Sequence, residues 1–345
     1  MSIKTIINRQ YAIANNEADA IDLPKQKIYA MCNLRGGIGK TTLSFNLSYL
    51  VDNLLAVDTC PQGNLSYFYD NNYYAGQQTN VKDMLLPYLV PGLGKATRVS
   101  AYIGATNHFF EQKNNYYIPS SEELYLLPSQ LITAINQTAG LQHAQKEQAL
   151  KSILYSLKKE IERELNENSL DKCLIDTSPF FAGATQLAWY AADALIIPVR
   201  TDQQSIKSLE LLINTLSNPQ SEFRKYLPEN DMNIPKIQMV VLTHCGWSTV
   251  AGARNEPNQQ TKVYLNKVYD IISKHRTLLS TANPENHLFM LDDFLGSGRI
   301  SSIESKPMDL LQEGETKVID RVRVSVNKSV DKCKNQLKFI AEQLW

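Results

Sequence analysis

The sequence predicts an α/β protein with a twisted, mostly parallel sheet flanked by helices. Short apolar runs typical of buried strands alternate with segments of helical periodicity along most of the chain, as in βαβ units. A glycine-rich turn joins the first such run to the first helix. With 345 residues, 43% of them hydrophobic and 20% charged, the chain can bury a large core and is not predominantly disordered.

The individual elements follow from these patterns in chain order. Residues 1–24 are polar and weakly periodic, so we expect an N-terminal arm or short helix before a single domain over residues 25–345. Buried strands are expected at residues 28–33, 54–58, 173–176, 194–199, 237–243 and 287–291. Helices are expected at residues 41–50, 150–165, 205–216 and 263–274, and from about residue 317 to the C-terminus. Residues 65–121 are rich in Tyr, Asn and Gly and are expected to form a loop-rich excursion.

Composition narrows the classes of partner and compartment. The 35 basic and 35 acidic residues balance, so no global charge predicts a nucleic-acid or membrane partner, and any such surface must be a local patch. The five cysteines are odd in number and include no C-x-x-C pair, which argues against a disulfide framework or a thiolate metal site. The N-terminus lacks an apolar signal segment and no run is long enough to span a membrane. We therefore expect a cytoplasmic protein with no membrane partner.

The segment RGGIGKTT, residues 35–42, lies where the first strand gives way to the first helix. Glycines let successive N–H groups turn around an anion, and the helix N-terminus adds positive potential. Lys40 would reach the terminal phosphates of a bound ligand and Thr41 would ligate Mg²⁺. Because Leu34 occupies the first glycine position of the strict pattern, this is a deviant form with a basic residue before Gly-Gly. The predicted phosphate-binding residues are Gly36, Gly37, Ile38, Gly39, Lys40, Thr41 and Thr42.

Asp176 ends the apolar strand expected at residues 173–176. In open parallel sheets, ligands bind outside the carboxyl ends of the strands. An isolated acid at this position is therefore predicted to face the crevice where ligands bind.

The motifs together resemble the ParA/MinD family of deviant Walker-type ATPases, most closely its ParA branch. Matching stretches run in family order from about residue 27 to 310, and include CNLRGGIGKTTLSFNLS, VDTCPQGNLS, LYLLPSQL and KCLIDTSPFFAGATQLAWYAADALIIPV. VVLTHCG and GRISSIESKP match more loosely. The resemblance implies a P-loop NTPase fold that uses ATP and Mg²⁺ and forms a homodimer on ATP binding. It also implies nonspecific DNA binding at the nucleoid, and positioning of a cargo such as a plasmid with a ParB-like or cargo adaptor protein.

The resemblance also assigns roles to single residues. Lys40 matches the phosphate lysine, Thr41 a magnesium ligand and Asp176 the Walker B acid, which also serves as a magnesium ligand. Asp58 matches the first acid of the switch after the second strand, with a part in catalysis and metal binding. Arg35 stands where the family carries a signature lysine that reaches the partner's nucleotide, and its fork would allow bidentate contacts. Cys60 replaces the second acid of the D-x-D-P-Q switch, which is tied to water activation, so hydrolysis is expected to be slow.

The C-terminal segment leaves two interpretations open. Between residues 317 and 345, seven basic residues face three acidic ones, a net of plus four that suits either a DNA-binding surface or a solvated helix face. The apolar stripe of this segment favours packing against the sheet over a MinD-like membrane anchor. It comprises Val322, Val326, Val330, Cys333, Leu337, Ile340 and Leu344.

Other classes of protein share the glycine-rich loop. An iron–sulfur carrier with the same loop would need cysteine pairs, which are missing. The alternative function is a nucleotide-binding regulatory or scaffold switch of the same fold that hydrolyses ATP little or not at all. The five histidines show no paired ligand spacing. His244 is interpreted as a surface residue at a strand end, with the nucleotide crevice as the other possibility.

Overall fold

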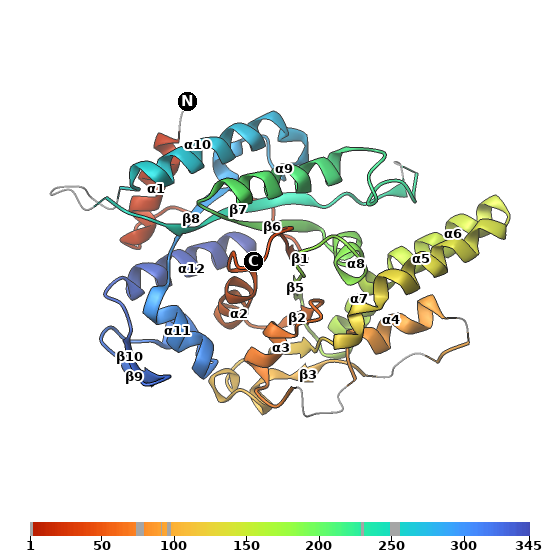
Figure 1. The fold of residues 1–345 in the computed structure, drawn as a ribbon, viewed down its shortest axis with the longest axis horizontal. Helices are drawn as coiled ribbons and strands as arrows, with labels where there is room; N and C mark the ends of the chain where they lie inside the picture. The colour runs from red at the N-terminus through yellow and green to blue at the C-terminus, as the bar shows by residue number, and fades with distance from the viewer. Residues whose placement is uncertain (1–2, 74–78, 91, 95–97, 229–230, 249–255) are drawn as a thin grey trace.

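The computed structural model describes residues 3–73, 79–90, 92–94, 98–228, 231–248 and 256–345. At its centre lies an eight-stranded sheet with the order β3-β4-β2-β5-β1-β6-β7-β8 (Figure 1). All neighbours pair in parallel except β3 and β4. The strands are β1 (Ile28–Met31), β2 (Leu54–Asp58), β3 (Ala101–Tyr102), β4 (Tyr116–Ile118), β5 (Lys172–Asp176), β6 (Ala194–Arg200), β7 (Lys236–Cys245) and β8 (Leu288–Asp292). The predicted fold class is confirmed.

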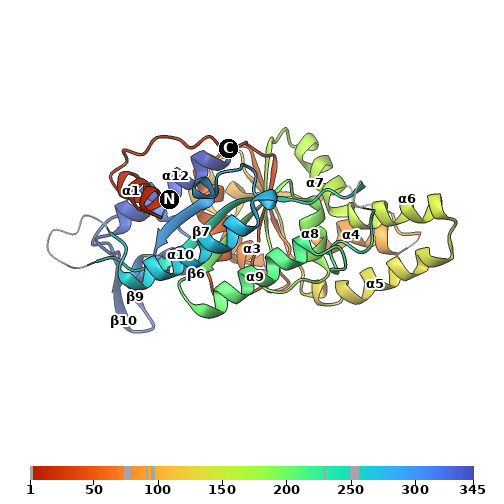
Figure 2. The ribbon, with the colours of Figure 1, turned by 90° about the horizontal axis from the view of Figure 1, so that it is seen from above.

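Helices cover both faces of this sheet (Figures 1 and 2). Helices α4 to α10 supply apolar residues to the core on one face, whereas α2, α11 and α12 supply the core on the other. The helices are α1 (Lys4–Ala14), α2 (Lys40–Leu50), α3 (Asn64–Tyr69), α4 (Val81–Leu89), α5 (Leu127–Gln137), α6 (His143–Leu154), α7 (Ser156–Glu167), α8 (Ala184–Ala191), α9 (Gln203–Ser217), α10 (Gln259–Lys274), α11 (Leu295–Glu304) and α12 (Val330–Leu344). Among the described residues, no helix is both long and apolar enough to cross a membrane.

The central strands are continuous apolar runs because both of their faces are buried. In β1, Ile28 and Ala30 belong to the core on one face, while Tyr29 and Met31 belong to the other. Alternation of side chains across the pleat requires this division. The register places Asp58 of β2 opposite Asp176 of β5. Two carboxylates therefore lie side by side at the carboxyl edge of the sheet.

The expected loop-rich excursion at residues 65–121 is wrong in part. It contains α3, α4 and the two strands that complete one edge of the sheet, although residues 74–78, 91 and 95–97 lie outside the described residues. The start of α4 carries a sequence signal, since the Asn80 side chain caps the helix and Asp83 bonds back to the Asn80 backbone. The strands are two and three residues long, too short for alternation to be read from sequence.

Two helix predictions also need correction. The helix expected over residues 150–165 consists of α6 and α7, which meet at Tyr155. The helix expected from residue 317 begins only at Val330. Before it, β9 (Thr316–Ile319) and β10 (Val322–Ser325) form an antiparallel hairpin. Its two turn residues, Asp320 and Arg321, have φ angles of 48° and 67°, as a tight type I′ hairpin requires. The prediction was wrong because the valines of this segment recur every four residues, which suits a helix. The alternation of side chains within the two hairpin strands was therefore missed.

The first and the last helix, α1 and α12, both pack against the sheet. In α1, Gln10 is buried and its Nε2 donates to the carbonyl of Met290 at 2.9 Å. The apolar stripe of α12 includes Leu337, Ile340 and Leu344, all buried in the core that α2 and α11 share. The expected packing of the C-terminal helix is confirmed for residues 330–344.

Candidate functional site

The turn between β1 and α2 surrounds a small cavity. Gly37 and Gly39 have φ angles of 69° and 90°, a left-handed conformation that strains any residue with a side chain. Gly39 is also the N-cap of α2. All of residues 36–42 line this phosphate cavity of about 200 Å³, joined by Cys60, Gln62, Asn64, Thr177 and Pro179. A helix N-terminus that opens onto such a glycine turn is suited to bind an anion.

Lys40 begins α2 and is almost fully buried, with 7% of its surface exposed. Its Nζ donates to the carbonyls of Asn33 at 3.1 Å and Arg35 at 2.8 Å. Burial lowers the pKa of this ammonium, and the negative charge of Asp176 opposes the shift. Because its present partners are neutral carbonyls, the cation is available to an anion in the adjacent cavity.

Asp176 is fully buried at the end of β5. Its Oδ2 accepts a hydrogen bond from Thr41 Oγ1 at 2.8 Å, and its Oδ1 accepts one from Ser44 Oγ at 2.9 Å. Burial raises the pKa of this carboxyl to about 6, while both hydrogen bonds and the charge of Lys40 hold it down. The predicted pair of magnesium ligands, Thr41 and Asp176, is thus brought into direct contact.

Asp58 holds the loop that follows β2. Its Oδ2 accepts from the backbone N and the Oγ of Ser66, both at 2.8 Å, and its Oδ1 accepts from the backbone N of Cys60 at 3.1 Å. Burial and then the charge of Asp176 raise the pKa of Asp58 to about 7, against these hydrogen bonds. The structure therefore uses Asp58 to position the switch loop, and within the described chain Cys60, not Asp58, lines the phosphate cavity.

Cys60 lies in the wall of the cavity, at the position of the second acid of the D-x-D-P-Q switch. Only 6% of its surface is exposed. Burial, followed by the charge of Asp58, raises the pKa of the thiol to about 12. The side chain is therefore a neutral thiol at pH 7 and a poor proton acceptor.

A second, larger cavity adjoins the first. This nucleoside cavity, as we name it, has a volume of about 480 Å³ and shares Gly37, Gly39 and Thr42 with the phosphate cavity. Apolar walls come from α2, β8, α11 and β9 through Leu43, Leu291, Phe294, Leu295, Ile303 and Ile319. An apolar cavity with a few polar groups that continues from an anion site matches the two ends of a nucleotide.

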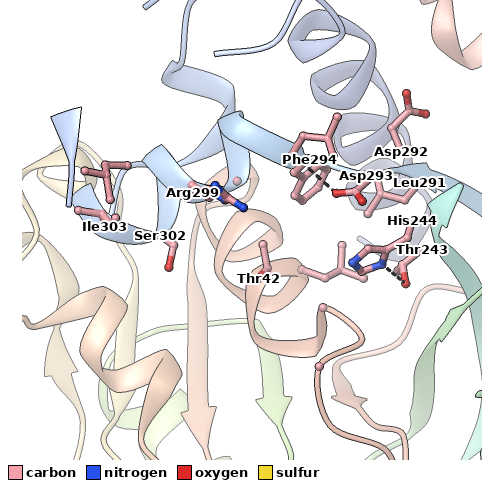
Figure 3. A pocket seen from close by; sticks show the side chains of 16 residues that line it. Thr42, Thr243, His244, Leu291, Asp292, Asp293, Phe294, Arg299, Ser302 and Ile303 are labelled. Carbon is pink, nitrogen blue, oxygen red and sulfur yellow. Dashed lines mark hydrogen bonds between the residues drawn. The ribbon is translucent and has the colours of Figure 1, made fainter. Parts of the chain in front are cut away.

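Sequence reasoning missed most polar residues of the nucleoside cavity. Figure 3 shows His244, Asp293 and Arg299 around the same space as Thr42. These side chains come from the ends of β7 and β8 and from α11, so only the fold assembles them. His244, interpreted as a surface residue, lines this cavity, which corrects that interpretation. The sequence feature that could have indicated this part of the site is the Asp292-Asp293 pair after an apolar run.

Arg35 folds back onto its own chain. Its Nη1 donates to Oδ1 of Asp202, and also to Oγ of Ser205 at 2.7 Å. Asp202 is the N-cap of α9 and accepts from the backbone N of Ser205 at 2.9 Å. Arg35 and Asp202 border a polar cavity of about 710 Å³ beside the nucleoside cavity.

The seven basic residues counted near the C-terminus do not form one helix face. Lys332 lies 3.3 Å from Oδ2 of Asp292 and 3.2 Å from the ring centroid of Trp247, and only 14% of its side chain is exposed. Three others pair with acids: Lys317 with Glu304, Lys334 with Asp331 and Lys338 with Asp309. Exposed Arg321 and Arg323 on the hairpin, and Lys328 after it, are the three without a described ion pair.

The comparisons with known proteins agree with this geometry. A family model described as an AAA domain matches residues 26–228. The sporulation initiation inhibitor protein Soj of Bacillus subtilis strain 168 is 27% identical over 271 residues, which are 77% of this chain and 91% of Soj.

Two solved structures share the fold. An ATP complex of a McdA variant from Cyanothece has a TM-score of 0.58 at 15% identity, over 93% of this chain and 97% of that one. A putative plasmid partition protein from Borrelia burgdorferi B31 bound to AMPPNP has a TM-score of 0.50 at 15% identity, over 93% of this chain and all of that one (100%). With the family match over residues 26–228 and the phosphate loop at its start, the chain belongs to this AAA domain family and is a P-loop ATPase of the ParA/MinD type.

Proposed function

We propose that this protein binds Mg²⁺-ATP, dimerises in response, and uses the dimer to bind DNA nonspecifically and position a cargo. The single observation that carries the proposal is the junction of the two cavities at Gly37, Gly39 and Thr42. One cavity is built for phosphates and the other for an apolar base. The relatives extend the inference, since the McdA variant was solved with ATP and the Borrelia protein with AMPPNP.

The phosphate end follows from the residues at the start of α2. Lys40 can exchange its carbonyl partners for phosphate oxygens. Thr41 and Asp176 form an oxygen-only set that suits Mg²⁺. When bound, this ion would neutralise charge that develops on the phosphate oxygens. Asp58 contributes by holding the switch loop through Ser66 and Cys60.

Dimerisation and DNA binding rest on two cationic groups. Arg35 lies at the edge of the phosphate loop with 26% of its side chain exposed, where a partner's phosphates could replace Asp202. On the hairpin and the turn before α12, Arg321, Arg323 and Lys328 are exposed. Three phosphate contacts per protomer give weak binding, and two linked sets in a dimer bind far more tightly. A ParB-like or cargo adaptor protein would then act on the dimer.

A second candidate function is favoured by Cys60. A buried neutral thiol in place of an ionised acid removes a group that typically contributes about 10²- to 10⁴-fold in rate. The protein would then act mainly as a regulatory or scaffold switch that stays bound to ATP. Nucleotide exchange or a partner would end that state.

Light scattering and DNA binding in three nucleotide states test the proposal. With a slowly hydrolysed ATP analogue and Mg²⁺ we expect a dimer that binds mixed-sequence DNA. With ADP, or without nucleotide, we expect a monomer and little binding. Lys40→Ala should behave like the nucleotide-free protein. A nucleotide-independent monomer, or DNA binding unaffected by nucleotide, would contradict the proposal, and steady-state ATP turnover with and without DNA separates the two candidates.

A further inference from the structure

The carboxyl end of β7 carries a bulge in the wall of the nucleoside cavity. Leu242 pairs with Met290 and Cys245 pairs with Asp292, so Thr243 and His244 together face the single residue Leu291. His244 has a φ angle of 56°, a left-handed conformation that is uncommon for a residue with a side chain. Bulges of this kind re-aim a side chain and are frequent beside active sites. Here the bulge directs the imidazole to the cavity (Figure 3).

The hydrogen bonds of Thr243 determine which ring nitrogen of His244 carries the proton. The Thr243 hydroxyl donates to the carbonyl of Ile38 at 3.1 Å. A hydroxyl has one proton, so toward Nδ1 of His244, 3.2 Å away, it acts as the acceptor. Nδ1 of the neutral ring therefore carries the hydrogen and Nε2 keeps a lone pair. Thr201 Oγ1 donates to the His244 carbonyl at 3.1 Å and holds the backbone of the bulge.

The groups around the ring support the neutral form. Burial lowers the pKa of His244, and the cation of Arg200 lowers it further. The carboxylates of Asp293, from the end of β8, and Asp202, at the start of α9, act in the opposite direction. At pH 7 the ring thus offers an acceptor, not a cation, to the cavity.

The position of His244 matches the middle of a nucleotide. Its ring is connected by two hydrogen bonds to Ile38 of the phosphate loop, and it lines the cavity that begins at Thr42. In a nucleotide the sugar joins the phosphates to the base. A side chain at the border of the phosphate loop and the nucleoside cavity therefore lies beside the sugar, whose hydroxyl groups can donate.

On the basis of the proposed ATP binding, we infer that His244 is a specificity-determining residue whose Nε2 accepts a hydrogen bond from a ribose hydroxyl. The bulge, the bond to Thr243 and the bond from Thr201 hold this acceptor in place. The site then prefers ribonucleotides over deoxyribonucleotides. Thr243 is a positioning residue. Its hydroxyl proton is used in the bond to the Ile38 carbonyl, and its oxygen selects the tautomer of His244.

Calorimetry with ATP, 2′-deoxy-ATP and 3′-deoxy-ATP in the presence of Mg²⁺ tests this inference. We expect the full-length protein to bind at least one deoxy analogue about threefold to tenfold more weakly than ATP, the effect of one hydrogen bond. His244→Asn tolerates the left-handed backbone, but its shorter side chain ends near the position of Nδ1 and places no acceptor at that of Nε2, so it should bind the three nucleotides equally. His143→Asn, at a histidine whose side chain is 89% exposed on α6, should keep the wild-type ratio.

A spectroscopic measurement on the unmodified protein does not depend on the folding of a variant. Nitrogen NMR of histidine-labelled protein should show His244 as the Nδ1–H tautomer, with an Nε2 signal that moves on addition of ATP and moves less with the analogue that lacks the contacted hydroxyl. Equal affinities for all three nucleotides, an unchanged ratio in His244→Asn, or an Nε2–H tautomer would each overturn the role of His244 while leaving ATP binding intact. A wild type that binds no nucleotide would instead overturn the proposed function and this inference with it.

Discussion

Arg35 of the phosphate loop forms an ion pair with Asp202, the residue that caps the N-terminus of α9. The two residues are 167 positions apart in sequence and come together because β1 and β6 are neighbours. The pair keeps the guanidinium within its own chain. Burial acts to raise the pKa of Asp202, but the backbone N–H of Ser205 and the pair with Arg35 together lower it. Any role of Arg35 across a dimer must begin by breaking this pair.

Asp202→Asn should therefore strengthen ATP-dependent dimerisation. Asparagine keeps the helix cap but releases the cation, and a partly exposed ion pair is worth up to about 1 kcal/mol, or roughly fivefold in the dimer constant. Arg35→Ala should abolish dimerisation and leave ATP affinity within a few-fold of the wild type. Light scattering as a function of protein concentration measures both. Identical dimer constants for wild type and Arg35→Ala would show that Arg35 does not act in trans.

Asp176→Asn should remove the contribution of Mg²⁺ to ATP binding. The amide offers one oxygen where the carboxylate offers two, while the hydroxyl of Thr41 can still donate to it. We expect affinity measured with Mg²⁺ to fall to the value measured with a chelator. Lys40→Ala should weaken binding about 10- to 100-fold in either condition, because it removes a hydrogen-bonded cation. Lys146→Ala, at an exposed lysine on α6, is the matched control. If the Asp176→Asn protein still responds to Mg²⁺, the ligand assignment is wrong.

Cys60→Asp should raise single-turnover hydrolysis by about 10²-fold or more, since a carboxylate can orient and accept a proton from the attacking water. Cys60→Ser has similar size and no ionisable acid at neutral pH, so it should stay as slow as the wild type. Binding of ATP should change little in either protein. A wild type already as fast as Cys60→Asp would mean that this position does not limit hydrolysis.

Neutralising Arg321, Arg323 and Lys328 should weaken DNA binding and flatten its dependence on salt. Each lost phosphate contact lowers the slope of log K against log salt by about 0.9. Lys334→Gln and Lys338→Gln should have smaller effects because each lysine has an acidic partner, Asp331 and Asp309. Fluorescence anisotropy at several salt concentrations distinguishes the two sets. Equal losses from both sets would place the DNA surface elsewhere.

His287 should make the fold sensitive to acid. Its ring is fully buried; Nδ1 donates to the Gln238 carbonyl at 2.8 Å, while Nε2 accepts from the Thr281 backbone N at 3.3 Å. Burial lowers its pKa from the usual 6.5. The unfolded chain therefore binds the proton first, and the stability contributed by neutral His287 is present above about pH 6.5 and is lost as the pH falls below it.

Denaturant unfolding of His287→Asn at several pH values checks this. The variant should be less stable than wild type by about 1–3 kcal/mol at pH 7.5, because buried polar groups lose their partners. That difference should shrink between pH 6.5 and 5, and His143→Asn should show no such trend. A difference independent of pH would indicate that His287 does not control the acid response.

The local sequence determined the parts of this protein that depend on neighbouring residues. A glycine turn between a strand and a helix is contiguous, so residues 36–42 could be assigned before any fold was known. The central strands were equally readable, because burial on both faces requires continuous apolar runs. Asp176 could be placed at the crevice since its strand ends there. The prediction for the C-terminal hairpin was wrong because a spacing of four residues between valines is compatible with both a helix and a strand. Only the turn at Asp320 and Arg321 distinguishes the two.

Tertiary structure alone decided the partners of these residues. Crossover connections bring together strand ends that are far apart in sequence, so Arg35 contacts Asp202, and His244 and Asp293 line the same cavity as Thr42. The tertiary structure also decided that Lys332 is only partly exposed, lies beside Asp292 and Trp247, and is not part of a basic surface. The ionisation of Asp58, Asp176 and Cys60 depends on burial and on through-space charge. Neither quantity exists until the chain is folded, because both depend on distances that sequence order does not contain.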